Sequence, residues 1–178
     1  MDFTEKMIAS RTVMKGNLLQ FKIDTVLLPN GKEATREWVQ HPGAVAVVAV
    51  DDQNRICMVR QYRYPLGQEL LEIPAGKMDQ AEDPLDCAKR ELKEEAGLSA
   101  ASWSLMHSYY TTPGFSDEII HLYHASGLTA GENQPDEDEF LEMVMVPCAE
   151  AIDMLQAGKI KDSKTIIALL SVFGGEIR

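Results

Sequence analysis

Three glutamates close to position 95 are the residues of this chain whose types and spacing most directly indicate chemistry. Glu91 and Glu95 are one helical turn apart, and Glu94 is next to Glu95. Like charges at this spacing repel one another on a helix, but carboxylate oxygens are the ligands that a hard divalent cation prefers. The spacing alone leaves two interpretations open: a metal site, or a solvated acidic helix face paired with Lys89 and Lys93.

The glutamates need a helix to place them side by side, and the surrounding sequence predicts one over residues 84–96. Asp83 is a suitable N-cap, and Pro84 suits the first helical position, where its missing N–H breaks no bond. Gly97 suits the position after the last turn, where φ is often positive. Four apolar residues recur at helical spacing and predict one buried face: Leu85, Ala88, Leu92 and Ala96.

A longer pattern around this helix is more specific than the glutamates alone. From residue 76 the chain reads G-x5-E-x7-R-E-L-x-E-E-x-G-L, and its nine fixed positions are Gly76, Glu82, Arg90, Glu91, Leu92, Glu94, Glu95, Gly97 and Leu98. The segment resembles the Nudix box, with no departure at any fixed position. The resemblance implies an α/β (α+β) fold, an α/β/α sandwich with a mixed sheet. It also implies metal-dependent hydrolysis of a nucleoside diphosphate linked to another moiety.

The resemblance to the Nudix family extends to individual residues. It implies Glu91, Glu94 and Glu95 as metal ligands and the backbone carbonyl of Ala75 as a further ligand. Glu82 resembles a supporting or outer metal residue. Arg90 resembles the group that orients a glutamate through a charge-assisted hydrogen bond, so Arg90 and Glu94 are also candidates for a part in catalysis. The implied cofactor is Mg²⁺ or Mn²⁺, and two or three ions are expected because one cation does not offset both phosphates and the glutamates.

Short sequence segments outside the box resemble those of the ADP-ribose pyrophosphatase branch of the family. They are HPGAVAV, VRQYRYP, LLEIPAG, YTTPGFSDE and DEDEF, within a resemblance that covers residues 10–172. Pro113 lies fifteen residues past Leu98, where the branch carries a marker proline, so Pro113 and Gly114 are candidates for substrate binding. The branch implies hydrolysis of ADP-ribose to AMP and ribose 5-phosphate. A hydrolase of another nucleotide sugar, such as GDP-mannose, and a non-catalytic nucleotide sensor stay open as alternatives.

Two further groups of candidates lie outside the box. Arg63 follows a predicted strand, and its planar fork suits a phosphate. Arg60, three residues earlier, would point to the opposite face if the strand continues. Glu137 and Glu139 lie in the acidic loop 131–139 and are candidates for a general base or an outer metal ligand. A solvated run of charge is the alternative for that loop, as an exposed side chain is for Arg63.

The first 41 residues predict a small N-terminal β unit, followed by the Nudix domain over residues 42–178. Residues 19–27 alternate apolar and polar side chains, and Asn30-Gly31 favours a tight hairpin turn because both residues tolerate positive φ. One face of a hairpin needs a cover, and a second subunit would supply it. The branch implies a homodimer in which this unit helps to bind adenine, with candidates Arg36, Glu37 and, more weakly, Phe21.

The remaining pattern predicts the elements that support the box. Residues 44–50 indicate a strand buried on both faces, and further strands are expected at 55–62, 69–73, 103–110, 118–125 and 140–146. Residues 148–158 and 163–173 have helical spacing, with Ser163 as a suitable N-cap. Strands and helices mix without strict alternation, which favours a mixed sheet flanked by helices.

Composition narrows the class of protein. The chain has 178 residues and a formal net charge of −11, so it repels phosphate backbones and a nucleic-acid partner is not expected. Cys57, Cys87 and Cys148 are scattered and predict reduced core thiols rather than disulfides or a zinc site. The first ten residues do not form a signal peptide, and the longest apolar run, 44–50, is too short for a membrane span. A cytoplasmic enzyme acting on a small nucleotide sugar is expected.

Overall fold

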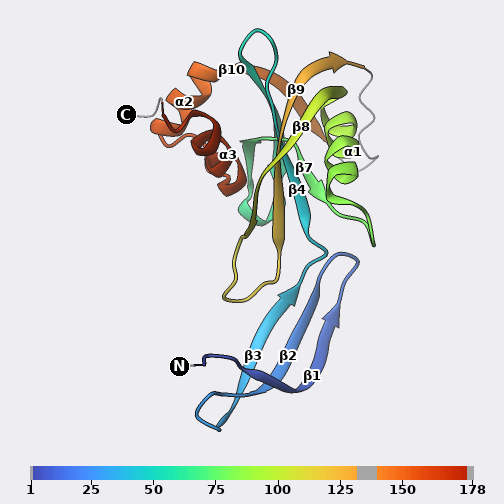
Figure 1. The fold of residues 1–178 in the computed structure, drawn as a ribbon, viewed down its shortest axis with the longest axis vertical. Helices are drawn as coiled ribbons and strands as arrows, with labels where there is room; N and C mark the ends of the chain where they lie inside the picture. Colours follow the sequence, from blue (N-terminus) through green and yellow to red (C-terminus); the bar gives the residue numbers. More distant parts are fainter. Residues whose placement is uncertain (1, 132–139, 176–178) are drawn as a thin grey trace. The chain divides into compact units, whose positions relative to one another are not determined.

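The structure is a computed structural model that describes residues 2–131 and 140–175 (Figure 1). The chain divides into two compact units, here called the N-terminal unit (Met1–Gly43 and Tyr109–Ile120) and the main unit (Ala44–Ser108 and His121–Arg178). The segment 109–120, predicted to belong to the second domain, is thus grouped with the N-terminal strands. The predicted boundary at residue 41 lies two residues before the first unit's break after Gly43.

Two sheets form the centre of the main unit. The first has the order β7-β4-β9-β8, with β7 Ala75–Lys77, β4 Ala44–Ala49, β9 Ile119–Ala130 and β8 Leu98–Tyr110. The second has the order β10-β5-β6, with β10 Leu141–Pro147, β5 Arg55–Arg63 and β6 Gln68–Glu72. A short 3-10 helix, η1 (Tyr64–Leu66), joins β5 to β6. The predicted strand at 44–50 is confirmed, because every residue from Val45 to Ala49 is fully buried.

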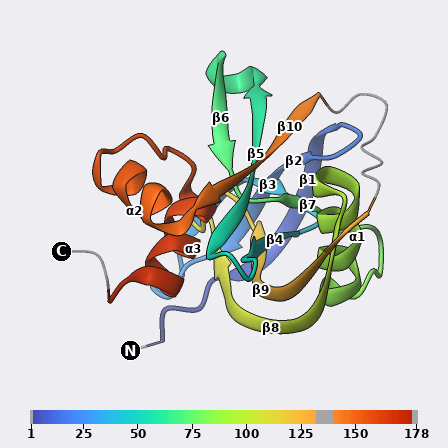
Figure 2. The ribbon, with the colours of Figure 1, turned by 90° about the horizontal axis from the view of Figure 1, so that it is seen from above.

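Helices cover both sides of these strands. Figures 1 and 2 show α1 (Pro84–Ala96) on one side, and α2 (Cys148–Gln156) and α3 (Ser163–Phe173) on the other. The predicted α/β/α sandwich is confirmed. The predicted N-cap of α3 is wrong, because Asp162 caps this helix and Ser163 is its first residue. Asp162 has the extended dihedral angles of an N-cap, and its carboxylate accepts a hydrogen bond from the Thr165 N–H at 2.9 Å.

The main core lies between α1 and the strands. The apolar face of α1 packs in one cluster with residues of β4, β5 and β9, among them Val45, Val47, Cys57 and Tyr123. All three cysteines are buried, as predicted. Burial raises the pKa of the Cys57 thiol to about 12, so this residue packs as a small apolar side chain and is not a reactive thiolate.

The N-terminal unit contains a three-stranded antiparallel sheet in the order β1-β2-β3. Its strands are β1 (Lys6–Lys15), β2 (Gln20–Leu27) and β3 (Glu33–Gln40). The predicted hairpin of β2 and β3 is confirmed, whereas β1 was not predicted. The pairing of β1 with β2 shifts register twice, between Met7 and Ala9 and between Thr12 and Met14, and such bulges break the alternation that identifies a strand.

The hairpin turn differs in detail from the prediction. Gly31 has a φ of 79°, whereas Asn30 has no positive φ. The Gly31 N–H donates to the Leu28 carbonyl at 2.9 Å, and the Leu28 N–H donates to the Lys32 carbonyl at 2.8 Å. Pro29 fixes its own φ near −65° and takes an early turn position, so the glycine alone takes the left-handed conformation.

Candidate active site

Helix α1 is fixed at both ends by the residues that the sequence predicts. The Asp83 carboxylate accepts hydrogen bonds from the N–H groups of Leu85 at 2.9 Å and Asp86 at 3.3 Å. At the other end Gly97 has a φ of 63°, and its N–H reaches the carbonyls of Leu92 and Lys93. With the helix defined over these thirteen residues, the directions of its glutamate side chains are also defined.

The Glu91 carboxylate lies against strand β7, in the space beside Gly76 that a Cβ atom would enter. A Cβ atom built on Gly76 would be 1.9 Å from Glu91 Cδ and 2.0 and 2.2 Å from its two carboxylate oxygens. The Glu91 residue is only 6% exposed. The absence of a side chain at Gly76 therefore creates the space that the carboxylate occupies, and this explains the first glycine of the box.

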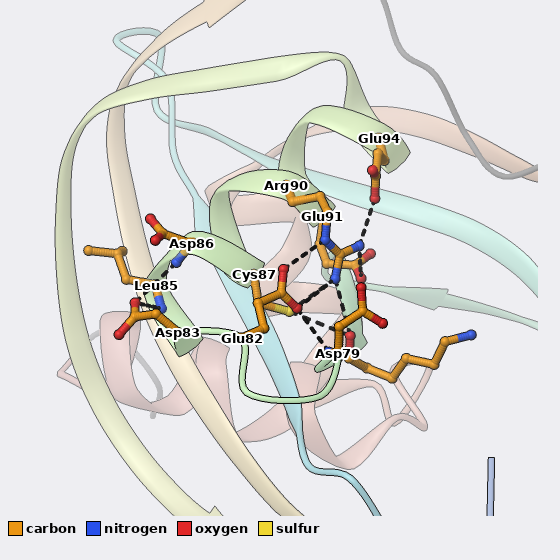
Figure 3. Close-up of polar contacts among 10 residues, drawn as sticks. Asp79, Glu82, Asp83, Leu85, Asp86, Cys87, Arg90, Glu91 and Glu94 are labelled. Carbon is orange, nitrogen blue, oxygen red and sulfur yellow. Dashed lines mark hydrogen bonds and ion pairs between the residues drawn. The ribbon is translucent and has the colours of Figure 1, made fainter.

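Arg90 is surrounded by three carboxylates (Figure 3). Its Nε and Nη2 donate to the two oxygens of Glu82 at 2.9 and 3.0 Å. Its Nη1 donates to Glu91 and to Glu94, both at 2.8 Å. The bonds from Arg90 lower the pKa of Glu82 to about 2, and they raise the pKa of Arg90 above its ordinary value. The guanidinium thus offsets the repulsion among the glutamates.

Glu95 is the second buried carboxylate of the helix. It is 2% exposed and accepts a hydrogen bond from the Ala75 N–H at 3.0 Å. Ionised carboxylates are costly to bury unless a cation or hydrogen bonds compensate them. Glu91 and Glu95 therefore present oxygen donors of the kind that suits a hard divalent cation, at the strand that contains Ala75 and Gly76.

The residues of this site have the donor atoms that suit a divalent metal ion, but their side chains are not already arranged around one ion position. Within residues 2–131 and 140–175, no group of three or more His, Cys, Asp or Glu side chains is placed to hold an ion in the present arrangement. Arg90 supplies the positive charge here, through its bonds to Glu82, Glu91 and Glu94. Three of the residues predicted to hold or support the metal, Glu82, Glu91 and Glu94, are thus brought together around one arginine.

Arg63 at the end of β5 lies in a second ionic cluster. Its Nε and Nη2 donate to the two oxygens of Glu72 at 2.8 and 2.6 Å. Arg60 belongs to a different pair, with Glu142 at 3.6 Å. Sequence reasoning missed Glu72, which is only 1% exposed, and its second partner Lys164. The sequence does indicate this cluster: Glu72 lies within the otherwise apolar segment LLEI, and a buried carboxylate needs a cationic partner.

The substrate-binding candidates Phe21, Arg36, Glu37, Pro113 and Gly114 all belong to the N-terminal unit. Arg36 and Glu37 are exposed on β3, and Phe21 is half-buried on β2. The Arg36 guanidinium is paired with Glu5 through contacts of 2.5 and 2.8 Å.

Pro113 and Gly114 are exposed in the segment between β8 and β9. That segment is bonded to β3, since the Val39 N–H donates to the Phe115 carbonyl at 2.8 Å. The candidate bases Glu137 and Glu139 lie outside the described residues.

Comparison with known proteins now adds to this geometry. The family model described as the NUDIX domain matches residues 40–170. This chain belongs to the Nudix family. Nudix pyrophosphatases generally need divalent metal ions, which agrees with the carboxylates that the Nudix box gathers on α1. No helix in the described part of this Nudix protein is long and apolar enough to cross a membrane.

Two relatives of this Nudix chain match it along nearly its whole length. A Bacillus methanolicus protein named methanol dehydrogenase activator is 46% identical over 169 residues, which are 94% of this chain and 91% of the relative. The ADP-ribose pyrophosphatase of Bacillus subtilis (strain 168) is 42% identical over 167 residues, 93% of this chain and 90% of the relative. A solved ADP compounds hydrolase superposes with a TM-score of 0.84 at 22% identity, covering 99% of this chain and 98% of that one, which shows that the fold is shared.

Proposed function

We propose that this chain hydrolyses the pyrophosphate bond of ADP-ribose and releases AMP and ribose 5-phosphate. The observation that carries the proposal is the complete Nudix box, with Glu91 buried beside Gly76 and Glu95 buried and bonded to the Ala75 N–H, in a chain 42% identical to an ADP-ribose pyrophosphatase. The hydrolysis of another nucleotide sugar, such as GDP-mannose, is the nearest alternative.

Mg²⁺ or Mn²⁺ is the proposed cofactor, with two or three ions for a substrate of two phosphates. Glu91, Glu94 and Glu95 would hold the metal together with the Ala75 carbonyl, and Glu82 would be a supporting or outer residue. Such a cation offsets the charge of the pyrophosphate and lowers the pKa of a bound water.

Arg90 has a positioning role in this proposal. Its Nη1 bonds to both Glu91 and Glu94 at 2.8 Å, and its fork is anchored on Glu82, so it fixes the direction of the carboxylates.

The residues proposed to remove the proton of the attacking water and to bind the substrate phosphates lie outside α1. Glu137 or Glu139 is the proposed general base that removes a proton from the attacking water. Arg63 is the proposed phosphate-binding side chain: its guanidinium is held by Glu72 on one edge, and the residue is only partly buried. Arginine suits this role because its planar fork matches two phosphate oxygens at once.

The N-terminal unit is proposed to dimerise and to contribute to the adenine site. Strand β1 is exposed along its whole length, including the apolar side chains Met7, Ile8, Val13 and Met14. An exposed edge strand with apolar residues is suited to pair with a second copy. Arg36, Glu37 and Phe21 are the proposed contacts to adenine, and Pro113 and Gly114 the proposed substrate-selecting turn.

The direct test is to incubate the protein with ADP-ribose and Mg²⁺ and to identify the products by chromatography. AMP and ribose 5-phosphate in equal amounts are expected, in a reaction that EDTA stops. Binding of ADP-ribose without products would instead identify a nucleotide sensor. A faster reaction with GDP-mannose in the same panel would support the alternative substrate.

A second candidate function comes from the relative at 46% identity, whose name is methanol dehydrogenase activator. Action on a partner enzyme is compatible with nucleotide hydrolysis in one chain. Its test is the rate of a methanol dehydrogenase with and without this protein, where wild-type protein and Glu95→Gln would show whether any activation needs the hydrolytic site.

A further inference from the structure

A buried ionic cluster joins the ends of β5 and β6 to the first turn of α3. Glu72 is at its centre: Arg63 holds both of its oxygens, and the Lys164 ammonium bonds to its Oε2. Lys164 Nζ also donates to Asp162 Oδ1 at 2.9 Å. The Glu72 and Lys164 side chains are 1% and 9% exposed, so the two opposite charges are compensated inside the protein and not by water.

The position of Lys164 is set by a second connection between the same elements. The Ile73 N–H donates to Thr165 Oγ1 at 2.9 Å, and that hydroxyl donates to Asp162 Oδ2 at 2.6 Å. Glu72 is the last residue of β6, and Ile73 follows it. Both are thus bonded to residues of α3, Glu72 to Lys164 and Ile73 to Thr165. Lys164 therefore approaches Glu72 along a fixed direction, and Glu72 has little freedom to rotate.

Arg63 is the more exposed of the two cations bonded to Glu72. Its side chain is 38% exposed, against 9% for Lys164. The bonds to Glu72 use Nε and Nη2, and among residues 2–131 and 140–175 no group accepts a hydrogen bond from Nη1. The Nη1 edge is thus available to an external acceptor, and the orientation of that edge depends on Glu72.

We propose that Lys164 is a positioning residue that acts through Glu72 to orient the Arg63 guanidinium for a substrate phosphate. The inference rests on the proposed function, in which Arg63 meets the pyrophosphate. Lys164 holds the Oε2 atom and so fixes the carboxylate plane that Arg63 matches. The Lys164 ammonium also compensates part of the negative charge of Glu72. The attraction of the Arg63 guanidinium for a substrate phosphate is therefore less offset by that carboxylate. Lys164 itself is bonded on the inner side and touches no substrate atom.

A double-mutant cycle between Lys164 and Arg63 tests this proposal. The dissociation constant of ADP-ribose is measured by calorimetry in EDTA, which prevents hydrolysis, for the wild type, Lys164→Met, Arg63→Ala and the double variant. Lys164→Met should weaken binding about tenfold, a coupling that residues of one hydrogen-bond network commonly reach. In the Arg63→Ala background the same change should have no further effect, because the group that it orients is gone. A merely structural role would weaken binding equally in both backgrounds.

Matched variants complete the experiment. Lys161→Met removes an exposed lysine three residues earlier and should bind ADP-ribose as the wild type does. Lys164→Arg keeps the charge and should lose less than threefold in affinity, and any loss should again disappear with Arg63→Ala. If Lys164→Met does not fold in a thermal melt, Lys164→Gln, which removes the charge and keeps a hydrogen-bond donor, takes its place in the cycle with the same expected and contradicting outcomes.

Lys164→Met with wild-type affinity, or effects of Lys164 and Arg63 that multiply, would overturn the inference. A wild-type protein that neither binds nor hydrolyses ADP-ribose would instead overturn the proposed function itself.

Discussion

The Glu91 carboxylate fills the volume that a side chain at Gly76 would occupy, with Cδ 1.9 Å from the position of the missing Cβ atom. The two residues lie fifteen positions apart in the sequence, one on a strand and one on a helix, and the box fixes both. A side chain introduced at Gly76 would therefore also displace the Glu91 carboxylate.

Gly76→Ala should displace Glu91 and lower kcat by roughly two orders of magnitude, because metal-held charge stabilisation amounts to several kcal/mol. Overpacking should also cost about 1–3 kcal/mol of stability. Steady-state kinetics over a Mg²⁺ series and a chemical denaturation curve measure the two effects. Gly175→Ala is the control, since a Cβ there meets no atom of the described residues within 4 Å. Wild-type kinetics for Gly76→Ala would show that Glu91 does not need its present position.

Glu95→Gln tests the buried carboxylate while keeping the size of the side chain. We expect kcat to fall by orders of magnitude, because the variant lacks the charge that would hold the metal, while the fold persists. The amide can still accept the hydrogen bond from the Ala75 N–H, which is 3.0 Å long in the wild type. Turnover measured at limiting Mg²⁺ is the readout, and near-normal turnover would refute the assignment of Glu95 as a metal ligand.

The acidic loop is tested by Glu137→Gln and Glu139→Gln, made separately. The general base typically contributes about 10²- to 10⁴-fold to the rate, so one variant should lose activity on that scale and the other should not. The pH dependence of kcat should lose its acidic limb in the same variant. If neither change slows the reaction tenfold, the loop is a solvated run of charge and the base lies elsewhere.

The Glu82–Arg90 pair predicts how stability depends on pH. Arg90 lowers the pKa of Glu82 from 4.5 to about 2, so the folded protein binds the proton less readily than the unfolded chain. The stabilising contribution is therefore complete above about pH 4.5 and is lost as the pH falls toward 2. Urea denaturation at several pH values should show this loss in the wild type and a flatter profile in Glu82→Gln. Equal slopes for the two proteins would contradict the pairing.

Arg36→Ala examines the N-terminal unit. If Arg36 binds adenine, KM for ADP-ribose should rise with little change in kcat, because stacking of arginine on a base contributes about 1–3 kcal/mol. The change also breaks the pair with Glu5, so Glu5→Gln is the matched control that breaks the pair and keeps the arginine. Light scattering of the wild type gives the oligomeric state, and a fully active monomer would exclude the proposed dimeric arrangement.

Features determined by residues close in sequence were mostly predicted correctly, whereas contacts between residues far apart in the chain were not. Helix α1 was predicted from Asp83 to Gly97 because its cap and its terminal glycine act on neighbouring residues. The cap of α3 was misplaced by one residue, since Asp162 and Ser163 are both good caps and the backbone angles decide between them. The role of Lys164 was not visible, because its partner Glu72 is 92 residues away in the chain.

The bond between Val39 and Phe115 has a consequence for recombination among relatives. The 109–120 segment is tied to the end of β3 by the Val39 N–H, by the return bond from the Asp117 N–H at 3.3 Å and by the His41 N–H, which donates to the Asp117 carboxylate at 2.7 Å. A chimera that exchanges residues 1–43 alone would combine a strand from one parent with a turn from another. Exchange of residues 1–43 together with 109–120 keeps these bonds within one parental sequence, so the two segments form one heritable block although 65 positions separate them.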